Sequence, residues 1–407
     1  MTPLSSASSR VLLRHAPFLL YFSSRGLSRF CYQIAAVAMG WQIYALTGSA
    51  LDLGMVGLVQ FIPTGLLVFA AGHVADRYDR KRVVQICQIV AGLTAAFLAW
   101  GSFAGWLTMP EIFMAVAIFG TATAFESPAG ASLLPGVVPE GMLQQGTAIS
   151  TGVYQVAMIS GPALGGLAYA LAPWAPYALM ALGWLLAGVL SGAIRLDRPV
   201  SPREPPTFAD LFAGVGFVRR NSAILGTISL DLFAVLLGGV TTLLPIYARD
   251  ILQTGPWGLG VLRAAPAVGS LLMTAVLARH AINRQVGMRM FQAVIVFGLA
   301  TVVFSVSHLM WLSLLSLATL GAADTVSVVI RLSLVQVATP DAMRGRVSAV
   351  NFLFINASNQ LGGFESGLTA ALFGAVPAAL LGGIGTIAVA LLWMKLFPAL
   401  RHVQRLE

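Results

Sequence analysis

Apolar residues along the chain gather into twelve long stretches that short polar segments separate. Each stretch is long enough for a membrane-spanning helix, which needs about 20 mostly apolar residues. In the first half, the pattern predicts spans at about 17–45, 51–75, 83–104, 109–134, 143–171 and 174–194. In the second half, it predicts spans at about 222–247, 257–279, 288–307, 309–338, 347–373 and 377–397. We therefore predict an all-α membrane protein whose twelve transmembrane helices form two pseudo-symmetric six-helix bundles.

One extended polar segment separates the two halves. Its first part contains four prolines, which cannot continue a helix: Pro199, Pro202, Pro205 and Pro206. Thr207 and Asp210 then resemble a capping box, so we expect a short helix from about 208 to 220. Its apolar residues fall near helical spacing, which fits either a helix on the membrane surface or a plain linker helix: Leu211, Phe212, Val215 and Val218. The predicted domains are 1–194, the cytoplasmic linker 195–221, and 222–407.

The second half repeats the first at an offset of 201 residues. The segment Pro139-Glu140-Gly141-Met142 aligns with Pro340-Asp341-Ala342-Met343, and Gly161 aligns with Gly362 without a gap. Parallel repeats of apolar halves build transporters whose binding site lies between the two halves. The repeat therefore predicts a duplicated membrane domain with a transport function.

Composition supports a lipid environment. The chain is 57% hydrophobic and only 10% charged, whereas a soluble protein carries about 25% charged residues. If both termini are cytoplasmic, 19 of the 24 basic residues lie in cytoplasmic segments, as the positive-inside rule requires. This placement accounts for the net charge of +9 without a nucleic-acid partner. We expect a multi-pass protein of the bacterial inner membrane, and a monomer.

The turn between the second and third spans has the sequence Gly72-His73-Val74-Ala75-Asp76-Arg77-Tyr78-Asp79-Arg80-Lys81-Arg82. Asp76 can face the positive N-terminus of another helix, and the basic residues can pair with carboxylates as a latch. The alternative is a basic loop that only sets topology. The segment resembles the major facilitator superfamily motif G-x-x-x-D-R-x-G-R-R/K, with matches at Gly72, Asp76, Arg77, Arg80 and Lys81. Asp79 replaces the second glycine. The resemblance implies a gating role, chiefly for Asp76 and Arg80.

The fifth span contains small residues and one proline: Gly152, Gly161, Pro162, Gly165 and Gly166. Such residues allow close helix packing and a bend. They also resemble the G-P-x-x-G-G motif that the superfamily associates with proton-coupled exporters. A wider resemblance to its enterobactin-exporter-like branch is carried by the runs 41–49 and 339–347, which read WQIYALTGS and TPDAMRGRV. This resemblance implies export of an amphipathic small molecule, such as a siderophore or a drug, and does not fix which one.

Several ionisable residues fall inside spans, where each costs roughly 2.5–3.5 kcal/mol on insertion scales. They are Arg25, Arg29, Glu126, Asp231, Arg263, Asp324, Arg331 and Glu365. We expect Asp231 to couple transport to protons, through a pair with Arg25 or through competition between Arg25 and a proton. Glu126 is the second proton candidate. Asp324 and Arg331 share one helix face and are expected to serve in a structural or gating ion pair, and Glu365 is expected to pair with Arg263.

A cargo cavity should be mostly apolar with a few polar anchors. Candidates on the central helices are Gln33, Trp41, Tyr44, Gln60, Phe233, Asn356 and Asn359. An alternative transporter is a flippase for lysophospholipids or other lipids, and a rival of another class is a membrane sensor or scaffold. The five histidines lie near span ends or in loops, and no H-E-x-x-H or nucleotide-binding loop occurs. We therefore expect no enzyme, metal or cofactor, and a gradient, with protons ahead of sodium, as the energy source.

Overall fold

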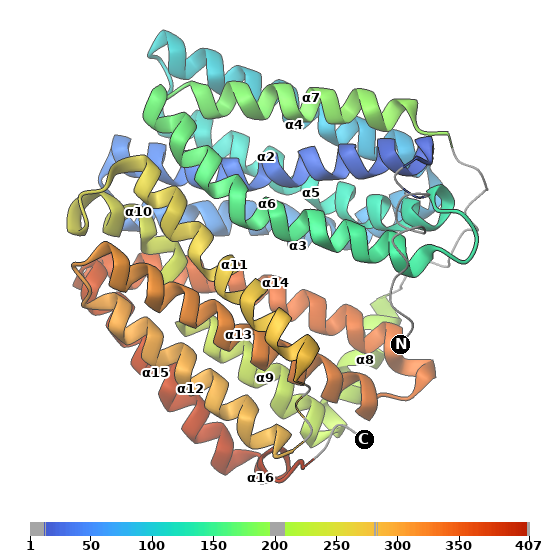
Figure 1. Ribbon diagram of the computed structural model, residues 1–407, viewed down its shortest axis with the longest axis vertical. Coiled ribbons are helices and arrows are strands. Elements are labelled where there is room, and N and C mark those ends of the chain that lie inside the picture. The colour runs from blue at the N-terminus through green and yellow to red at the C-terminus, as the bar shows by residue number, and fades with distance from the viewer. Residues whose placement is uncertain (1–11, 13, 196–207, 281, 283, 405–407) are drawn as a thin grey trace. The chain divides into compact units, whose positions relative to one another are not determined.

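The computed structural model describes residues 12, 14–195, 208–280, 282 and 284–404 (Figure 1). In these residues the secondary structure is helical, with no strand. The chain divides into two compact units, one comprising 1–42 and 62–205 and the other 43–61 and 206–407. The predicted all-α membrane fold is confirmed, while the domain boundaries read from the sequence stay a prediction.

The first half of the chain forms six long helices, and each coincides with a predicted span. Their bounds are α2 (Ala16–Thr47), α3 (Ala50–Arg77), α4 (Arg80–Ala104), α5 (Met109–Val137), α6 (Leu143–Leu171) and α7 (Ala175–Ala193). Helix α4 packs against α5 and α7. Small residues permit the second contact, because a Cβ at Gly92 would lie only 2.8 Å from Leu185 Cγ.

The second half begins with the short helix α8 (Phe208–Arg220) and continues with α9 (Ser222–Leu237). The long helices that follow are α11 (Gly255–Arg279), α12 (Val286–Ser305), α13 (Met310–Ala338), α14 (Asp341–Phe373) and α15 (Ala375–Leu396). A last turn, α16, spans Pro398–Arg401. Helix α13 packs against α11 and α12, and α9 packs against α14 and α15. Buried side chains such as Phe291, Ile330 and Trp393 join several of these helices in one core.

The predicted span 222–247 is interrupted, which corrects the expectation of one continuous helix. Helix α9 ends at Leu237, and Gly238 and Gly239 separate it from a 3-10 turn over Val240–Leu243. A single turn, α10 (Leu244–Ile246), and a π turn, η2 (Tyr247–Ile251), follow. Two consecutive glycines weaken a helix because they add backbone freedom and no side-chain packing. The segment 222–251 has a high mean hydropathy across the break, so hydropathy alone does not reveal it.

Helix α8 confirms the short helix predicted after the prolines. A Cβ at Gly214 would lie 2.9 Å from the carbonyl oxygen of Arg346, and Val218 is buried beside Val347 and Val350. Helix α8 therefore packs on the first turns of α14, while Phe212 on its other side is exposed. The predicted cap by Thr207 and Asp210 lies outside the described residues and side chains.

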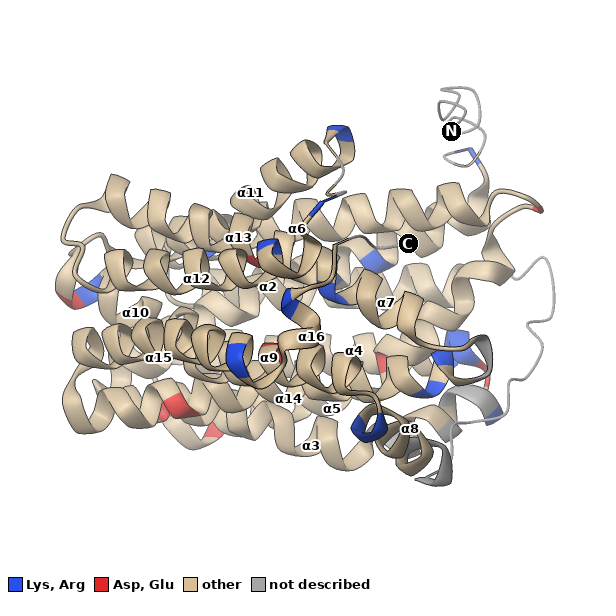
Figure 2. Cartoon of the chain, turned by 90° about the horizontal axis from the view of Figure 1, so that it is seen from below, with Lys and Arg blue, Asp and Glu red and all other residues tan. Residues whose placement is uncertain are grey.

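Within the described part of the chain, nine helical segments are long and apolar enough to cross a membrane. Most of the helical ribbon in Figure 2 carries no charged residue. Three of the twelve predicted spans, now helices α2, α6 and α14, are not among the nine. These three helices supply polar and charged residues to the cavities described below, which lowers their hydropathy.

Candidate functional site

In the first unit, the carboxylate of Glu126 on α5 is buried among polar donors from two other helices. Ser28 Oγ donates to Glu126 Oε1 at 2.8 Å, and Gln88 Nε2 donates to the same oxygen at 3.1 Å. Tyr32 donates to Oε2 at 3.4 Å, and the Arg25 guanidinium lies 3.8 Å from Oε1. A charge inside an apolar bundle needs such compensation. The arrangement therefore makes Glu126 the centre of a satisfied polar network.

This network extends to α7. The hydroxyls of Ser24 and Ser191 lie 2.6 Å apart, and Ser191 donates to Gln88 Oε1 at 2.7 Å. The indole nitrogen of Trp184 donates to Ser28 Oγ at 3.2 Å. Helices α2, α4, α5 and α7 are thus joined by hydrogen bonds deep inside the first unit.

Beside this network, α2 and α6 line a cavity of about 210 Å³. Its walls combine aromatic and apolar side chains with hydroxyls and two arginines: Tyr21, Phe22, Arg25, Arg29, Thr147, Ser150, Thr151, Val153 and Tyr154. The Arg29 guanidinium lies over the Tyr154 ring, 5.6 Å from its centroid. Such a cavity can accept a molecule that is apolar in part and polar in part.

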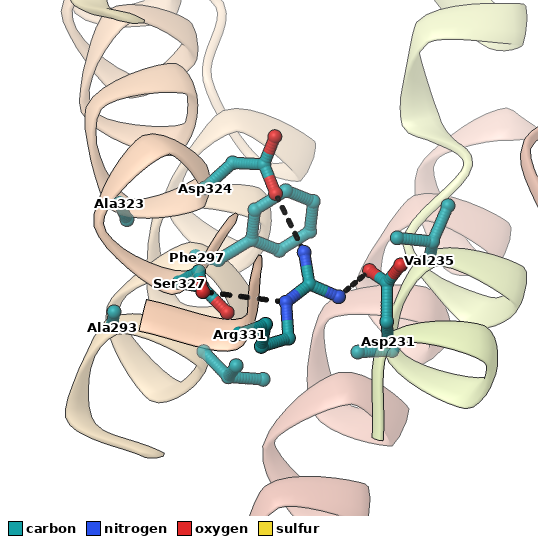
Figure 3. A pocket seen from close by; sticks show the side chains of 10 residues that line it. Asp231, Val235, Ala293, Phe297, Ala323, Asp324, Ser327 and Arg331 are labelled. Carbon is teal, nitrogen blue, oxygen red and sulfur yellow. Dashed lines mark hydrogen bonds and ion pairs between the residues drawn. The ribbon is translucent and has the colours of Figure 1, made fainter. Parts of the chain in front are cut away.

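In the second unit, one arginine is shared by two carboxylates (Figure 3). Arg331 of α13 forms a close ion pair with Asp231 of α9, and its Nη2 lies 3.9 Å from Asp324 Oδ1. Arg331 Nε also donates to the carbonyl oxygen of Ser327 at 3.4 Å. The side chains of Asp231 and Arg331 are each 10% exposed, whereas that of Asp324 is 45% exposed. We refer to Asp231, Arg331 and Asp324 as the acid–arginine triad.

A cavity of about 160 Å³ adjoins the triad, between α9, α13 and α14. All three triad residues line it, together with Asn351 and Asn359 of α14 and the hydroxyl-bearing Thr227 of α9. The remaining lining is aliphatic. A smaller space of about 20 Å³ on the other side of the triad is bordered by Phe297 and Ser327 (Figure 3). The triad carboxylates therefore border space in which water or a ligand fits.

The two units place their charges on corresponding helices with reversed sign. In the first half, the arginine is on the first long helix (Arg25) and the acid on the fourth (Glu126). In the second half, the acid is on the first long helix (Asp231) and the arginine on the fourth (Arg331). The repeat aligns Gly130 with Arg331, and a Cβ at Gly130 would lie 2.8 Å from Arg25 Cζ. In the first half, Gly130 thus leaves room for the side chain of Arg25. In the second half, the corresponding position is occupied by Arg331 itself.

Five of the predicted intramembrane charges form ion pairs within their own units: Arg25, Glu126, Asp231, Asp324 and Arg331. Arg25 pairs with Glu126, and Asp231 pairs with Arg331. Within its own unit, the partner of Asp231 is therefore Arg331, whereas Arg25 was assigned to it from the sequence. Sequence spacing cannot show which residue of another helix lies opposite a charge. A pair between Arg25 and Asp231 would join the two units and stays a prediction.

Glu365 on α14 accepts a hydrogen bond from Thr369 at 2.8 Å. This contact is a local one, four residues along the same helix. The predicted pairing of Glu365 with Arg263 stays a prediction.

The motif between α3 and α4 forms a capped turn. Asp79, which replaces the glycine of the family pattern, has φ −59° and is the N-cap of α4, accepting from the Lys81 backbone N–H at 3.0 Å. No glycine is required at such a φ. The Lys81 ammonium donates to the carbonyl oxygens of Gly192 and Ile194 at 3.4 and 3.2 Å, at the end of α7. Lys81 therefore ties α4 to α7 by satisfying carbonyls at a helix C-terminus.

The other motif residues differ in their surroundings. Arg80 is buried and Arg77 is exposed at the end of α3. A Cβ at Gly72 would meet no atom within 4 Å in the described residues. The side chain of Asp76 lies outside those described. The gating role of this motif stays a prediction.

The glycine-rich motif of α6 brings that helix close to α2. A Cβ at Gly165 would lie 3.1 Å from Ile34 Cα, and a Cβ at Gly161 would lie 2.6 Å from Gln33 Cβ. Pro162 and Gly166 are buried within the same helix, whereas a Cβ at Gly152 would meet open space. Close packing, which is one of the two interpretations of this motif, is therefore present, and its association with proton-coupled export stays a prediction.

The cargo candidates have varied contacts. Asn359 lines the cavity beside the triad, and its amide also donates to Ile355 O at 2.8 Å. Asn356 donates to Phe352 O at 2.8 Å, and Gln60 is partly buried on α3. Four further candidates contact other side chains: Gln33 bonds Met158, Trp41 packs on Tyr169, Tyr44 donates to Asp250, and Phe233 packs on Trp393. Their roles in binding stay predictions.

Sequence reasoning missed the polar partners of the charges. Ser28, Gln88 and Trp184 surround or support Glu126, and Asn351 and Thr227 line the cavity beside the triad. Gln88, a polar residue inside an apolar span, is the one signal in the sequence that could have pointed to this network. Ser and Thr are common in packed transmembrane helices, so they give no such signal.

These features define a multi-pass, all-α membrane protein built from a duplicated unit. The sequence profile of the Major Facilitator Superfamily matches residues 21–363, and the chain belongs to that superfamily. The enterobactin exporter EntS of Escherichia coli (strain K12) is 26% identical over 405 residues, covering 97% of this chain and 95% of that protein. The enterobactin exporter of Citrobacter koseri gives the same identity and coverage. The resemblance inferred from the sequence is confirmed.

Solved structures show the same fold. The nucleoside transporter NupG superimposes with a TM-score of 0.75 at 16% identity, covering 94% of this chain and 99% of that one. A bacterial homologue of the iron transporter ferroportin gives a TM-score of 0.72 at 18% identity, covering 96% and 100%. This family and these relatives are transporters, and the present chain is a transporter of the Major Facilitator Superfamily.

Proposed function

We propose that this transporter exports an amphipathic small molecule, of the siderophore or drug-like kind, from the bacterial cytoplasm in exchange for protons. The observation that carries the proposal is the acid–arginine triad, in which two carboxylates share one guanidinium beside a cavity. Export and the cargo class are supported by the relatives named enterobactin exporter. The glycine-rich motif of α6 also favours export over uptake.

The charge balance of the triad suits reversible protonation. With both carboxylates ionised, Asp231, Arg331 and Asp324 carry a net charge of −1. One proton on Asp324 makes the cluster neutral, and Arg331 keeps its close partner Asp231 throughout. Loading and release of the proton therefore never leave a buried guanidinium unpaired, a state that is strongly destabilising.

Exposure separates the roles of the two acids. The Asp324 side chain is 45% exposed and borders the cavities, so water can deliver a proton to it. Asp231 is 10% exposed and is engaged by Arg331. In this proposal Asp324 carries the proton and Asp231 positions the arginine. Glu126 is a structural charge, because its network already satisfies it.

The energy available matches a single site. One proton crossing about 150–200 mV supplies roughly 4 kcal/mol, which corresponds to a gradient of about a thousandfold in a neutral cargo. One titrating carboxylate per cycle is therefore sufficient. The cycle would be one of alternating access, with protonation of the triad favouring one state over the other.

The test uses purified protein in proteoliposomes with an imposed pH gradient, and measures both gradient-driven accumulation and counterflow exchange of candidate siderophores and hydrophobic drugs. We expect Asp324→Asn to abolish accumulation against a gradient while counterflow exchange continues. A matched control is Asp52→Asn, since Asp52 lies in the first turn of α3 and outside both cavities. Undiminished gradient-driven accumulation by Asp324→Asn would refute the assignment, and a lack of response of every cargo to the gradient would refute antiport.

A further inference from the structure

The cavity of the first unit has no role in the proton chemistry described above, yet it contains two arginines. Arg25 and Arg29, one helical turn apart on α2, both line its wall. Arg25 has its counter-charge in Glu126 at 3.8 Å. Arg29 forms no ion pair among the described residues, and its recorded partner is the ring of Tyr154. The two guanidiniums and one carboxylate leave a net charge of +1 at this cavity.

A second, independent feature lies on the opposite wall. Ser150 Oγ on α6 is buried and has no hydrogen-bond partner within the described part of the chain. Ser150 lines the same cavity, as do the hydroxyl-bearing Thr147 and Thr151 on that helix. Buried polar atoms in proteins are almost always paired with protein, water or ligand. Among the described residues, a hydroxyl without a hydrogen-bond partner and a guanidinium without an ion pair therefore line one space, and a ligand with an anionic oxygen would satisfy both.

The remaining lining of this cavity indicates the chemistry of the non-anionic part of the ligand. Phe22, Val153 and Tyr154 supply apolar and aromatic surface beside the charged groups. The volume of about 210 Å³ is far above the roughly 10–15 Å³ that one water molecule needs. This space accommodates an acidic head group with an adjoining ring or short chain.

The geometry points to an anion-binding subsite in this cavity, in which Arg29, assisted by Arg25 and Ser150, binds the carboxylate, phenolate or phosphate group of an amphipathic cargo. This inference rests on the proposed function, because it treats the cavity as the place where the exported molecule docks. Charge-assisted bonds from guanidinium to oxyanion are about twice as strong as neutral ones. The transporter therefore selects acidic amphiphiles over neutral molecules of the same shape.

The test compares two fluorescent probes that differ in charge, dansylglycine, which is anionic, and dansylamide, which is neutral. Binding is measured by fluorescence enhancement with full-length protein in nanodiscs of zwitterionic lipid, with empty nanodiscs as the blank. We expect the wild type to bind dansylglycine at least tenfold more tightly than dansylamide. We expect Arg29→Gln to lower the ratio of dansylglycine affinity to dansylamide affinity at least tenfold. Arg29→Lys should give a ratio between those of the wild type and Arg29→Gln, because lysine keeps the charge and loses the planar contact.

Two further variants keep the inference falsifiable. Arg219→Gln removes one positive charge at the exposed end of α8, far along the chain from the cavity residues, and should leave the preference unchanged. Ser150→Ala removes this hydroxyl without a change of charge. It should weaken the binding of dansylglycine by about threefold and the binding of dansylamide by less. Equal binding of both probes by the wild type, or equal effects of Arg29→Gln and Arg219→Gln, would overturn the inference.

Competition identifies the source of the anion. Displacement of dansylglycine by dodecanoate indicates a carboxylate cargo, displacement by dodecyl phosphate indicates a phosphate head group, and either supports the subsite if dodecanol fails to compete. Equal competition by dodecanol would overturn it. Because binding is measured without a gradient, its failure leaves gradient-driven export untouched, and failure of export in proteoliposomes leaves the binding result standing.

Discussion

Removal of Arg331 should destabilise the second unit more than removal of either carboxylate. Arg331 and Asp231 are each 10% exposed and form a close ion pair. Arg331→Met leaves two carboxylates, Asp231 and Asp324, facing each other without the cation between them (Figure 3). Loss of one partner from a buried ion pair costs about 3–5 kcal/mol, so we expect Arg331→Met to lower the free energy of unfolding by about that amount.

The opposite change should be milder, for a reason that the structure supplies. Asp231→Leu leaves Arg331 with Asp324 at 3.9 Å and with the Ser327 carbonyl at 3.4 Å. The guanidinium is then only partly uncompensated, and the expected loss is about 1–3 kcal/mol. In the double variant Asp231→Leu with Arg331→Met, the buried charges at both positions are gone. Its stability should therefore be closer to that of Asp231→Leu than to that of Arg331→Met.

The assay is reversible unfolding of the purified protein in mixed micelles by sodium dodecyl sulfate, followed by loss of helical circular dichroism. The double-mutant cycle then gives the coupling energy of the pair. Size-exclusion profiles before titration check that each variant enters the assay folded. The reasoning is refuted if Arg331→Met is within about 1 kcal/mol of wild type, or if the double variant is no more stable than Arg331→Met.

Three further changes test other parts of the structure. Gly165→Leu should prevent the approach of α6 to α2 and abolish the monodisperse peak in size exclusion, whereas Gly152→Ala should be tolerated because its Cβ meets open space. Asn221→Ala removes the side-chain cap of α9 and should lower the free energy of unfolding by about 1 kcal/mol, with Asn221→Ser nearly neutral; equal losses would contradict the cap. Glu126→Gln leaves Arg25 without its carboxylate and should lower the melting temperature, yet the surviving protein should still respond to a pH gradient in vesicles. If Glu126→Gln remains folded and loses its response to the pH gradient, the proton site would be assigned to the first unit instead.

The sequence predicted the helices well because membrane spans obey a simple length rule. Long apolar stretches and the repeat located the long helices of both halves, including the continuous helices that contain Pro63 and Pro162. The break after Leu237 was missed, because Gly238 and Gly239 sit in an apolar run whose hydropathy does not change. Hydropathy reports burial in lipid and carries little information on local backbone geometry.

Within one helix, spacing was also informative. Asp324 and Arg331 were placed on one face, and the structure brings them to 3.9 Å. Sequence spacing did not predict contacts between helices. The partners of Asp231 and Arg25 depend on helix rotation and packing, which are set by many weak contacts. The turn at Asp79 shows a further limit, because a residue that departs from the family pattern proved to be an N-cap, which is equally compatible with the turn.

The reversed polarity of the two acid–arginine clusters has a consequence for protein engineering. The ion pairs of the two repeated halves have opposite layouts, with the arginine on the first long helix in one half and the acid on the first long helix in the other. A chimera that exchanges α2 for α9 alone would set like charges against each other and strand a lone acid or a lone base in the hydrocarbon layer. Exchanges between the halves should therefore give a folded protein only when the first and fourth helices are exchanged together.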